Sequence, residues 1–411
     1  MFGSESTSDR RRLEVFSSLL LLVFLVNFGR VVFAPLLDPF IRAFDAGEAT
    51  VGLVATLAWM GSAVPRLPTG YLLTRFSRQR VILGTGLLLA GAALFTALAT
   101  TIWHVAVGAF LLGTGSGIYF IAANPLVSEL FPDRVGRVIG IHGTASQLAA
   151  VIAPLSVGIA IAVYSWRLLF VAVAVLALLG TAGFLHTARR AEMPEVGRGR
   201  RHLRRSVMNH WPIVLTAVAV IGATGFAWNG FFNFFVRYLT TTKSISPGVA
   251  GTLLTLIFAA GVPAFLLAGR LADRVSRIKL MLAIITGFVL SLAGMTVARG
   301  LVMVGVLTVL MGFVFHSLLP VIDTYLLDAL PDADRSSAYS AYSATMMVIQ
   351  ASASVVIGML IEAGFAFDQV YRGFSVMLAA VVLILLGLQA VGRLPEGSSE
   401  PGSNDAHGSD G

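Results

Sequence analysis

Charged side chains are rare inside the long apolar runs of this sequence, so the few found there are the residues best placed to do chemistry. Arg30 follows Asn27 by three residues, which puts both side chains on one face of a helix. Arg66 stands within the segment P-R-L-P-T-G. If these runs cross a bilayer, each arginine costs about 2.5–3.5 kcal/mol to insert and needs a partner, a cavity or a function.

We expect Asn27, Arg30 and Arg66 to bind substrate, and the positive charges favour a small anion. Two structural alternatives stay open. Arg30 could snorkel toward the membrane surface and pair with Asp38. Arg66 could have a structural role near the interface.

His316 and Asp323 are seven residues apart, close to two helical turns, and therefore share one helix face. A carboxyl group held there away from water could carry a coupling proton, and His316 could assist it or contact substrate. The alternative for Asp323 is a paired structural carboxylate.

Amides within the apolar runs form a further group of candidates. Asn229 and Asn233 lie one turn apart among aromatic residues, on a face that also includes Arg237. Gln147 and Gln350 are similarly placed in two other runs. Such amides either contact a substrate or hydrogen-bond neighbouring helices to each other.

The composition indicates that these residues lie in membrane-spanning helices. Of 411 residues, 56% are hydrophobic and 12% charged, which is too little polar surface for a water-soluble globule of this size. The apolar runs are long enough to cross a hydrocarbon core as helices, and they lack the alternation of a β-barrel. The expected spans are 14–37, 49–73, 81–100, 103–127, 138–163, 167–186, 212–238, 248–271, 280–298, 301–327, 338–363 and 372–392.

The sequence also repeats itself after 199 residues. The segment G-R-L-A-D-R-V-S-R-I-K at 269–279 matches G-Y-L-L-T-R-F-S-R-Q-R at 70–80, and D-A-L-P at 328–331 matches E-L-F-P at 129–132. We therefore predict an all-α membrane protein with twelve transmembrane helices in two pseudo-symmetric bundles of six. Its parts are a cytoplasmic N-terminus 1–13, a bundle 14–186, a cytoplasmic linker 187–211, a second bundle 212–392 and a disordered cytoplasmic tail 393–411.

Lysine and arginine are concentrated in alternate loops, and such loops face the cytoplasm. Both termini and the long middle loop are thus expected to be cytoplasmic in a multi-pass protein of the cell membrane. The arginines of the middle loop orient the chain; a lipid-surface or regulatory patch is the alternative.

Several classes of function are disfavoured. The sequence has no cysteine, P-loop, metal-ligand cluster or nucleophile constellation, which predicts neither an enzyme nor a bound metal or cofactor. The net charge of +8 lies in loops between spans rather than on one soluble face, which argues against nucleic acid as a partner. Without an ATP-binding domain, the energy for transport would come from an ion or substrate gradient.

The paired loop segments resemble the cytoplasmic signature of the major facilitator superfamily, found after the second and eighth helices of its members. W-R-L-L-F at 166–170 and the weaker Y-R-G-F at 371–374 extend the resemblance to the helix that ends each half. The first copy has Thr74 where the signature usually has an acid. The resemblance implies a gating motif, formed by Gly70, Arg75, Arg78, Gly269, Asp273 and Arg274.

In that superfamily the first, fourth, seventh and tenth helices line the central cavity. This implies substrate contacts from Trp228, Asn229 and Asn233. The other candidates for substrate binding are Asn27, Arg30, Asn124, Gln147, His316 and Gln350. Arg66 matches a substrate-binding arginine of nitrate/nitrite porters, but its repeat position is Phe265. The fifth helix holds only a thinned form of the glycine-proline pattern of drug/proton antiporters.

We therefore expect a monomeric secondary transporter that moves a small molecule, favoured to be an anion, across the lipid bilayer by proton-coupled alternating access. Symport, antiport and the direction of transport stay open. One alternative is a multidrug/proton antiporter. An alternative from another class is a transporter-like membrane sensor without flux.

Overall fold

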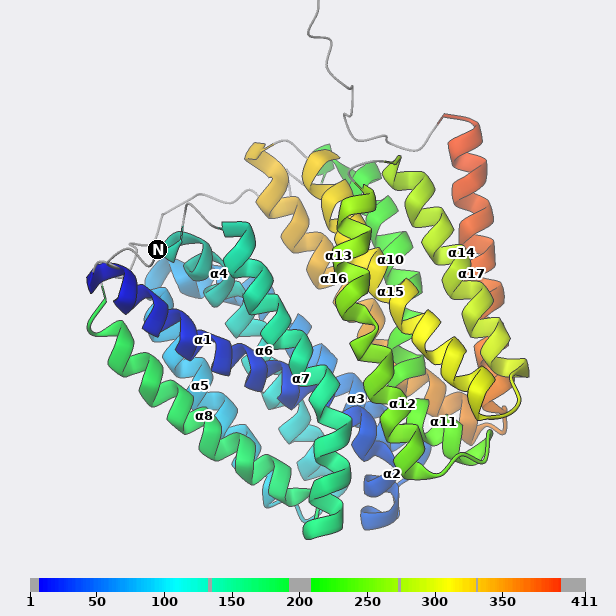
Figure 1. Cartoon of the computed structure of the whole chain (residues 1–411), viewed down its shortest axis with the longest axis horizontal. Coiled ribbons are helices and arrows are strands. Elements are labelled where there is room, and N and C mark those ends of the chain that lie inside the picture. The colour runs from blue at the N-terminus through cyan, green and yellow to red at the C-terminus, as the bar shows by residue number, and fades with distance from the viewer. Residues whose placement is uncertain (1–6, 132–134, 192–207, 273–274, 330–331, 393–411) are drawn as a thin grey trace, which may run out of the picture.

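The computed structural model describes residues 7–131, 135–191, 208–272, 275–329 and 332–392, and within these ranges every regular element is an α-helix. The helices form two bundles, seen on the left and the right of Figure 1. The N-terminal bundle contains α1 (Thr7–Val31), α2 (Phe33–Phe44), α3 (Glu48–Ala63), α4 (Arg66–Arg75), α5 (Arg78–Ala97), α6 (Ile102–Leu130), α7 (Val135–Val163) and α8 (Arg167–Ala188).

The C-terminal bundle has the same order of long and divided helices. It contains α10 (Trp211–Asn233), α11 (Phe235–Thr241), α12 (Pro247–Ala259), α13 (Gly261–Ala272), α14 (Arg277–Val297), α15 (Leu301–Ala329), α16 (Asp332–Glu362) and α17 (Phe367–Ala390). Helices α6 and α15 begin and end 199 residues apart (301 − 102 and 329 − 130). The first two spans of each half are also divided within a few residues of corresponding positions, so the repeat in sequence is a repeat in structure.

Eleven helices among the described residues are long and apolar enough to cross a membrane. The remaining predicted span, 49–73, is divided into α3 and α4 on either side of Val64 and Pro65. The proline has no N–H to donate, so one helical hydrogen bond is missing here, although Val64 itself keeps helical dihedral angles. The break places Arg66 at the start of a new helix.

Close packing within each bundle depends on glycines at repeated positions. A Cβ atom on Gly113 would overlap the carbonyl of Ala58, and one on Gly312 would overlap the carbonyl of Ile257. These two pairs are related by the 199-residue offset. Glycine at both sites therefore lets the fourth span of each half lie directly against the second, as small residues do in membranes.

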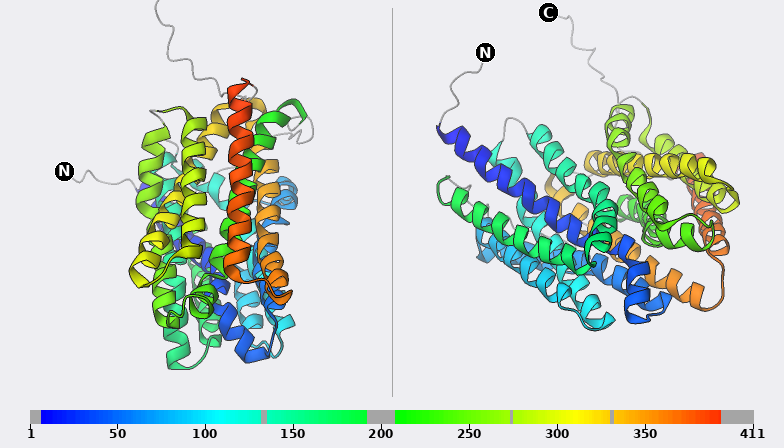
Figure 2. Two further views of the ribbon diagram at one scale, coloured as in Figure 1. Left: turned by 90° about the vertical axis from the view of Figure 1, so that its right-hand side faces the viewer. Right: turned by 60° about the horizontal axis from the view of Figure 1, so that its bottom comes forward.

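The two bundles meet mainly along α3 with α16 and α7 with α12, and α2 also contacts α10 and α11. Gly52 of α3 faces the backbone of α16 so closely that a Cβ atom would overlap the carbonyl of Ser354. We call the end at which α1 begins and α17 ends the proximal end, and the end that carries α2 and α11 the distal end. Figure 2 shows the same two bundles from two further directions.

Candidate functional site

Arg30 lies near the end of α1, at the interface between the bundles. Its Nη2 atom donates a 2.6 Å hydrogen bond to Oδ1 of Asn27, and its guanidinium carbon lies 4.3 Å from the ring centre of Trp59 on α3. The Asn27 amide donates in turn to the carbonyl of Ser146 on α7. The predicted face shared by Asn27 and Arg30 is present, and these contacts fix the arginine in place.

The alternative pairing of Arg30 with Asp38 is not found. Asp38 forms its ion pairs with Arg42 and Arg237. The Nε atom of Arg30 is buried and has no hydrogen-bond partner. A buried N–H donor of a charged group without an acceptor is costly, so this atom indicates a place for a ligand acceptor.

Arg66 reaches across from the N-terminal to the C-terminal bundle. Its Nε donates to the carbonyl of Ser62, and its Nη1 donates a 2.8 Å hydrogen bond to the hydroxyl of Ser343 on α16. The guanidinium groups of Arg66 and Arg30 also repel each other through their charges. The two arginines predicted from sequence thus belong to one electrostatic site.

A second bond across the interface joins Gln147 of α7 to His316 of α15, whose Nε2 atoms are 3.1 Å apart. Nδ1 of His316 lies 2.7 Å from the carbonyl of Gly312. A carbonyl only accepts, so Nδ1 carries a proton and Nε2 accepts from the Gln147 amide in the neutral ring. The imidazole is buried, and this arrangement holds it in one tautomer.

Aromatic rings connect these polar residues. Trp228 stacks on Phe315 with ring centres 4.1 Å apart, and its ring meets His316 edge-on at 5.3 Å. Phe232 lies one turn along from Trp228, and its ring centre is 5.9 Å from that of Trp59 across the interface. We call Asn27, Arg30, Trp59, Arg66, Gln147, Trp228, Phe232 and His316 the central cluster.

Other predicted site residues make contacts within the C-terminal bundle. The Asn233 amide donates to Oδ1 of Asn229 at 2.6 Å and to the hydroxyl of Ser354 at 3.0 Å. The Gln350 amide donates to the carbonyl of Ile221. These bonds join α10 to α16. Asn124, on α6, is exposed and apart from them. Substrate contact by these residues stays a prediction.

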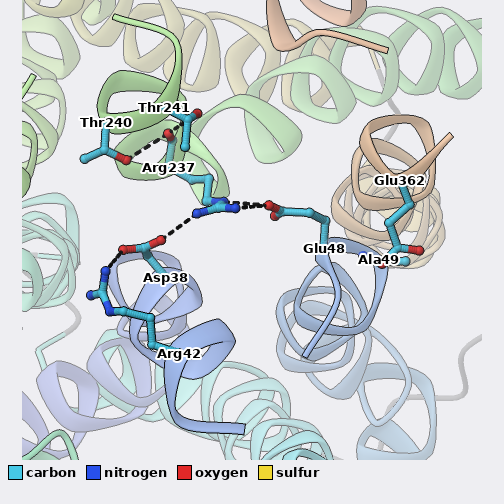
Figure 3. Close-up of polar contacts among 8 residues, drawn as sticks. All are labelled: Asp38, Arg42, Glu48, Ala49, Arg237, Thr240, Thr241 and Glu362. Carbon is cyan, nitrogen blue, oxygen red and sulfur yellow. Dashed lines mark hydrogen bonds and ion pairs between the residues drawn. The ribbon is translucent and has the colours of Figure 1, made fainter. Parts of the chain in front are cut away.

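At the distal end, charged residues of the two bundles are directly paired (Figure 3). Arg237 of α11 lies 2.8 Å from Oδ1 of Asp38 and donates through Nε to Glu48 at 2.6 Å. Glu362 at the end of α16 accepts from the backbone N–H of Ala49 at 2.9 Å. We call Asp38, Arg42, Glu48, Arg237 and Glu362 the distal network.

Sequence reasoning placed Arg237 on one face with Asn229 and Asn233, but the helix is interrupted at Phe234. The interruption puts Arg237 on the separate short helix α11, where it meets Asp38. These two residues are 199 positions apart, so they are equivalent positions of the two halves. That offset was the signal that could have identified the pair.

The first copy of the predicted gating motif, at 70–80, lies at the proximal end. Arg78 forms an ion pair with Glu129 of α6, and the Arg75 guanidinium lies 4.9 Å from the ring centre of Tyr71. Gly70 lies within α4. Asp273 and Arg274 lie outside the described residues, as do the immediate surroundings of Gly269 and the side chain of Asp323. The gating and proton-coupling roles of these residues stay predictions.

Trp59 and Ser343 were not predicted from sequence. Trp59 is an isolated aromatic in an apolar run. Ser343 is one of several serines in its own stretch of the sequence. Their importance arises from the way α3 and α16 dock, which neither residue signals by itself. Among the described residues, no group of histidine and carboxylate side chains is placed to hold a metal ion.

A chain of two equivalent helical bundles, with charged residues buried where the bundles meet, has the architecture of a membrane transporter. The family model of the Major Facilitator Superfamily matches residues 19–243 and 220–408. The chain belongs to this family and is a multi-pass membrane transporter. The predicted fold class and family are thereby confirmed.

Known proteins add two kinds of likeness. Multidrug resistance protein MdtG of Citrobacter koseri is 26% identical over 78% of this chain and 80% of its own length. An uncharacterized Escherichia coli transporter, YgaY, is 30% identical, but the match covers only 36% of this chain and 38% of YgaY. A bacterial homolog of the human lysosomal transporter Spinster, solved in an inward-facing and unoccupied conformation, has a TM-score of 0.74 with 17% identity, covering 95% of this chain and 98% of its own. At that identity the last likeness shows the fold alone.

Proposed function

We propose that this transporter moves a small organic anion across the membrane by alternating access, with the anion bound in the central cluster. The observation that carries the proposal is the pair Arg30 and Arg66. Both guanidinium groups lie at the interface and carry like charges, and the buried Nε of Arg30 has no acceptor. An anion placed against both groups would relieve the repulsion and accept the free hydrogen bond.

Trp59 supports an organic rather than a simple inorganic anion. The guanidinium of Arg30 lies over this ring, and Phe232 of the other bundle packs against it in a T-shaped arrangement. An anion with an apolar body could keep its charge on the arginines and pack that body against the aromatic rings. Because the site uses both bundles, its ligand would be sensitive to their relative position.

Closure of the distal network supports the alternating-access part of the proposal. Arg237 joins Asp38 and Glu48 only while the distal ends of the bundles touch. Breaking these pairs would let that end open while the other closes, which is the rocking motion of two-bundle transporters. If the predicted orientation is right, the distal end faces the exterior.

The test is a thermal-shift screen of purified protein against carboxylates, sulfonates and lipophilic cations, followed by uptake into proteoliposomes. A stabilising anion should lose about tenfold to a hundredfold in affinity in Arg30→Gln, because a hydrogen bond to a charged group is worth about 1.5–3 kcal/mol. Arg167→Gln is the matched control, since Arg167 also lies over a tryptophan, Trp166, at 4.4 Å. An anion that binds Arg30→Gln as tightly as the unsubstituted protein would contradict the proposed binding site.

Proton coupling is a separate part of the proposal and rests on His316 and Asp323. His316 is buried at the bundle interface, where its bond to Gln147 depends on the relative position of the bundles. Uptake should fall when a proton ionophore collapses the pH gradient, and His316→Gln and Asp323→Asn should remove that dependence. Wild-type uptake that is indifferent to the ionophore would exclude coupling to protons.

A second candidate function is drug export. It is favoured by the rings around Trp228, which include Phe258, Phe288 and Phe315, and by the name of the MdtG relatives. Lipophilic cations would then stabilise the protein, and Trp228→Ala would weaken their binding more than Arg30→Gln would. Stabilisation by anions alone would argue against export of cationic drugs.

A further inference from the structure

The distal end of the C-terminal bundle holds a polar pocket that is separate from the central cluster. Its volume is about 730 Å³, and it lies where the loops before α12 and α15 meet the start of α17. Three cationic side chains and one acidic side chain line it, namely Lys243, Arg299, Arg372 and Asp368. The pocket therefore carries net positive charge.

The acid is already neutralised, which leaves two arginines for a ligand. Lys243 lies 3.4 Å from Asp368 and donates to the carbonyl of Thr296 at 3.1 Å. Asp368 also accepts a 2.7 Å hydrogen bond from the hydroxyl of Tyr238. Arg372 donates through Nε to the Thr296 hydroxyl at 3.1 Å, which orients its guanidinium. Arg299 and Arg372 are both exposed and form no ion pair among the described residues.

An apolar groove continues from this pocket along the membrane-facing side of the bundle. The groove has a volume of about 660 Å³, lies between α12 and α15, and shares Val249 and Leu301 with the polar pocket. Its walls include the exposed side chains of Val302, Val306 and Val309, which recur along one face of α15. The hydroxyl of Thr252 bonds within its own helix, so the groove offers little to a polar ligand.

A cationic pocket at the end of a transmembrane helix pair, opening into an apolar groove of similar size, fits a molecule with an anionic head and a hydrocarbon chain. We propose that an anionic phospholipid of the leaflet at the distal end binds here, with its phosphate at Arg299 and Arg372 and an acyl chain between α12 and α15. Basic pockets of this kind bind lipid head groups through charge, while burial of the chain adds hydrophobic stabilisation. The groove selects a lipid over a free anion.

The experiment measures lipid binding to the delipidated full-length protein by native mass spectrometry. Dioleoyl phosphatidylglycerol should bind about tenfold more tightly than dioleoyl phosphatidylcholine. Arg299→Gln and Arg372→Gln should each lower the affinity for phosphatidylglycerol about fivefold, which is the effect expected for one cation near a membrane surface. Arg299→Lys and Arg372→Lys should retain most of the affinity. The control Arg167→Gln, which removes a cation from the distal end of the other bundle, should change nothing.

A second pair of variants separates a lipid from a free anion. Gly305 lines the groove, and a side chain there would meet only Leu253 at an ordinary 3.8 Å. Gly305→Phe should therefore fill the groove. It should weaken the binding of dioleoyl phosphatidylglycerol and leave the binding of the short-chain dihexanoyl lipid and of inorganic phosphate unchanged. The control is Gly91→Phe, on α5, where a side chain would meet nothing within 4 Å.

Three outcomes would overturn the proposal. The first is equal binding of the two dioleoyl lipids. The second is an effect of Arg167→Gln as large as that of Arg372→Gln. The third is loss of inorganic phosphate binding in Arg372→Gln with no effect of Gly305→Phe, which would identify a free-anion pocket.

Discussion

The distal end and the middle of the molecule use different chemistry to join the same two bundles. At the distal end, Arg237 pairs with two carboxylates, and its side chain is only 25% exposed. In the middle, the interface is bridged by hydrogen bonds that end on neutral partners, from Gln147 to His316 and from Arg66 to Ser343. Charged pairs thus close the distal end, while the middle is bridged by hydrogen bonds from Arg66 and Gln147 to neutral partners.

The comparison suggests that the distal end controls the conformation and that the middle binds the ligand. A contact that must break in every cycle can be strong only if other contacts replace it in the alternative conformation. A contact at a binding site must instead be weak enough for a ligand to replace it. Substitutions at the two levels should therefore shift the position of the bundles by different amounts, and the absence of cysteine allows this to be measured with introduced labels.

The largest effect is expected from Arg237→Gln. It leaves Glu48 partly buried without its cation and Asp38 with Arg42 alone, which costs about 3 kcal/mol and lowers the ratio of closed to open distal ends about a hundredfold. Spin labels on Ala43→Cys and Thr241→Cys, both exposed at the distal end, would report the separation by double electron–electron resonance.

The matched control for this change is Arg42→Gln. Arg42 also pairs with Asp38, but its side chain is 64% exposed, and such pairs contribute about 0–1 kcal/mol. The label distances should stay close to those of the unsubstituted protein. Equal opening by Arg42→Gln and Arg237→Gln would mean that burial does not distinguish the two pairs.

An intermediate effect is expected from Gly52→Val. The added side chain would overlap the Ser354 carbonyl of α16, and overpacking of this kind costs about 1–3 kcal/mol. The same labels should move apart. The control is Gly158→Val, which should change the melting temperature of the protein little because a side chain at Gly158 meets nothing within 4 Å. Unchanged label distances in Gly52→Val would show that α3 and α16 can separate without opening the distal end.

The smallest effect is expected from Gln147→Ala. Loss of one neutral hydrogen bond to His316 costs about 1 kcal/mol, a change of about fivefold in the ratio of conformations. Thr144→Ala, at an exposed site of the same helix, α7, where the hydroxyl bonds to the carbonyl of Gly140, is the control and should have no effect. A double-mutant cycle with His316→Ala should give a coupling energy of about 1 kcal/mol between the two side chains; additive effects would contradict a direct contact.

The repeat made the fold predictable, because two similar halves with apolar runs of spanning length leave few architectures open. The pattern of hydropathy located Arg30 and Arg66, since a charge within an apolar run is visible in sequence. The partners of these residues were not predictable in the same way. Trp59 and Ser343 reach them only because of the angle at which the bundles dock, and docking depends on close contacts such as that of Gly52 with α16.

Asp38 and Arg237 occupy the same position in the two repeats, and they touch. Around a two-fold axis, a residue beside the axis meets its own counterpart, so an ancestor with identical halves would have set like charge against like charge at this point. An acid in one half and a base in the other remove that repulsion. They also make the charge of each half complementary to that of the other half rather than to a copy of itself.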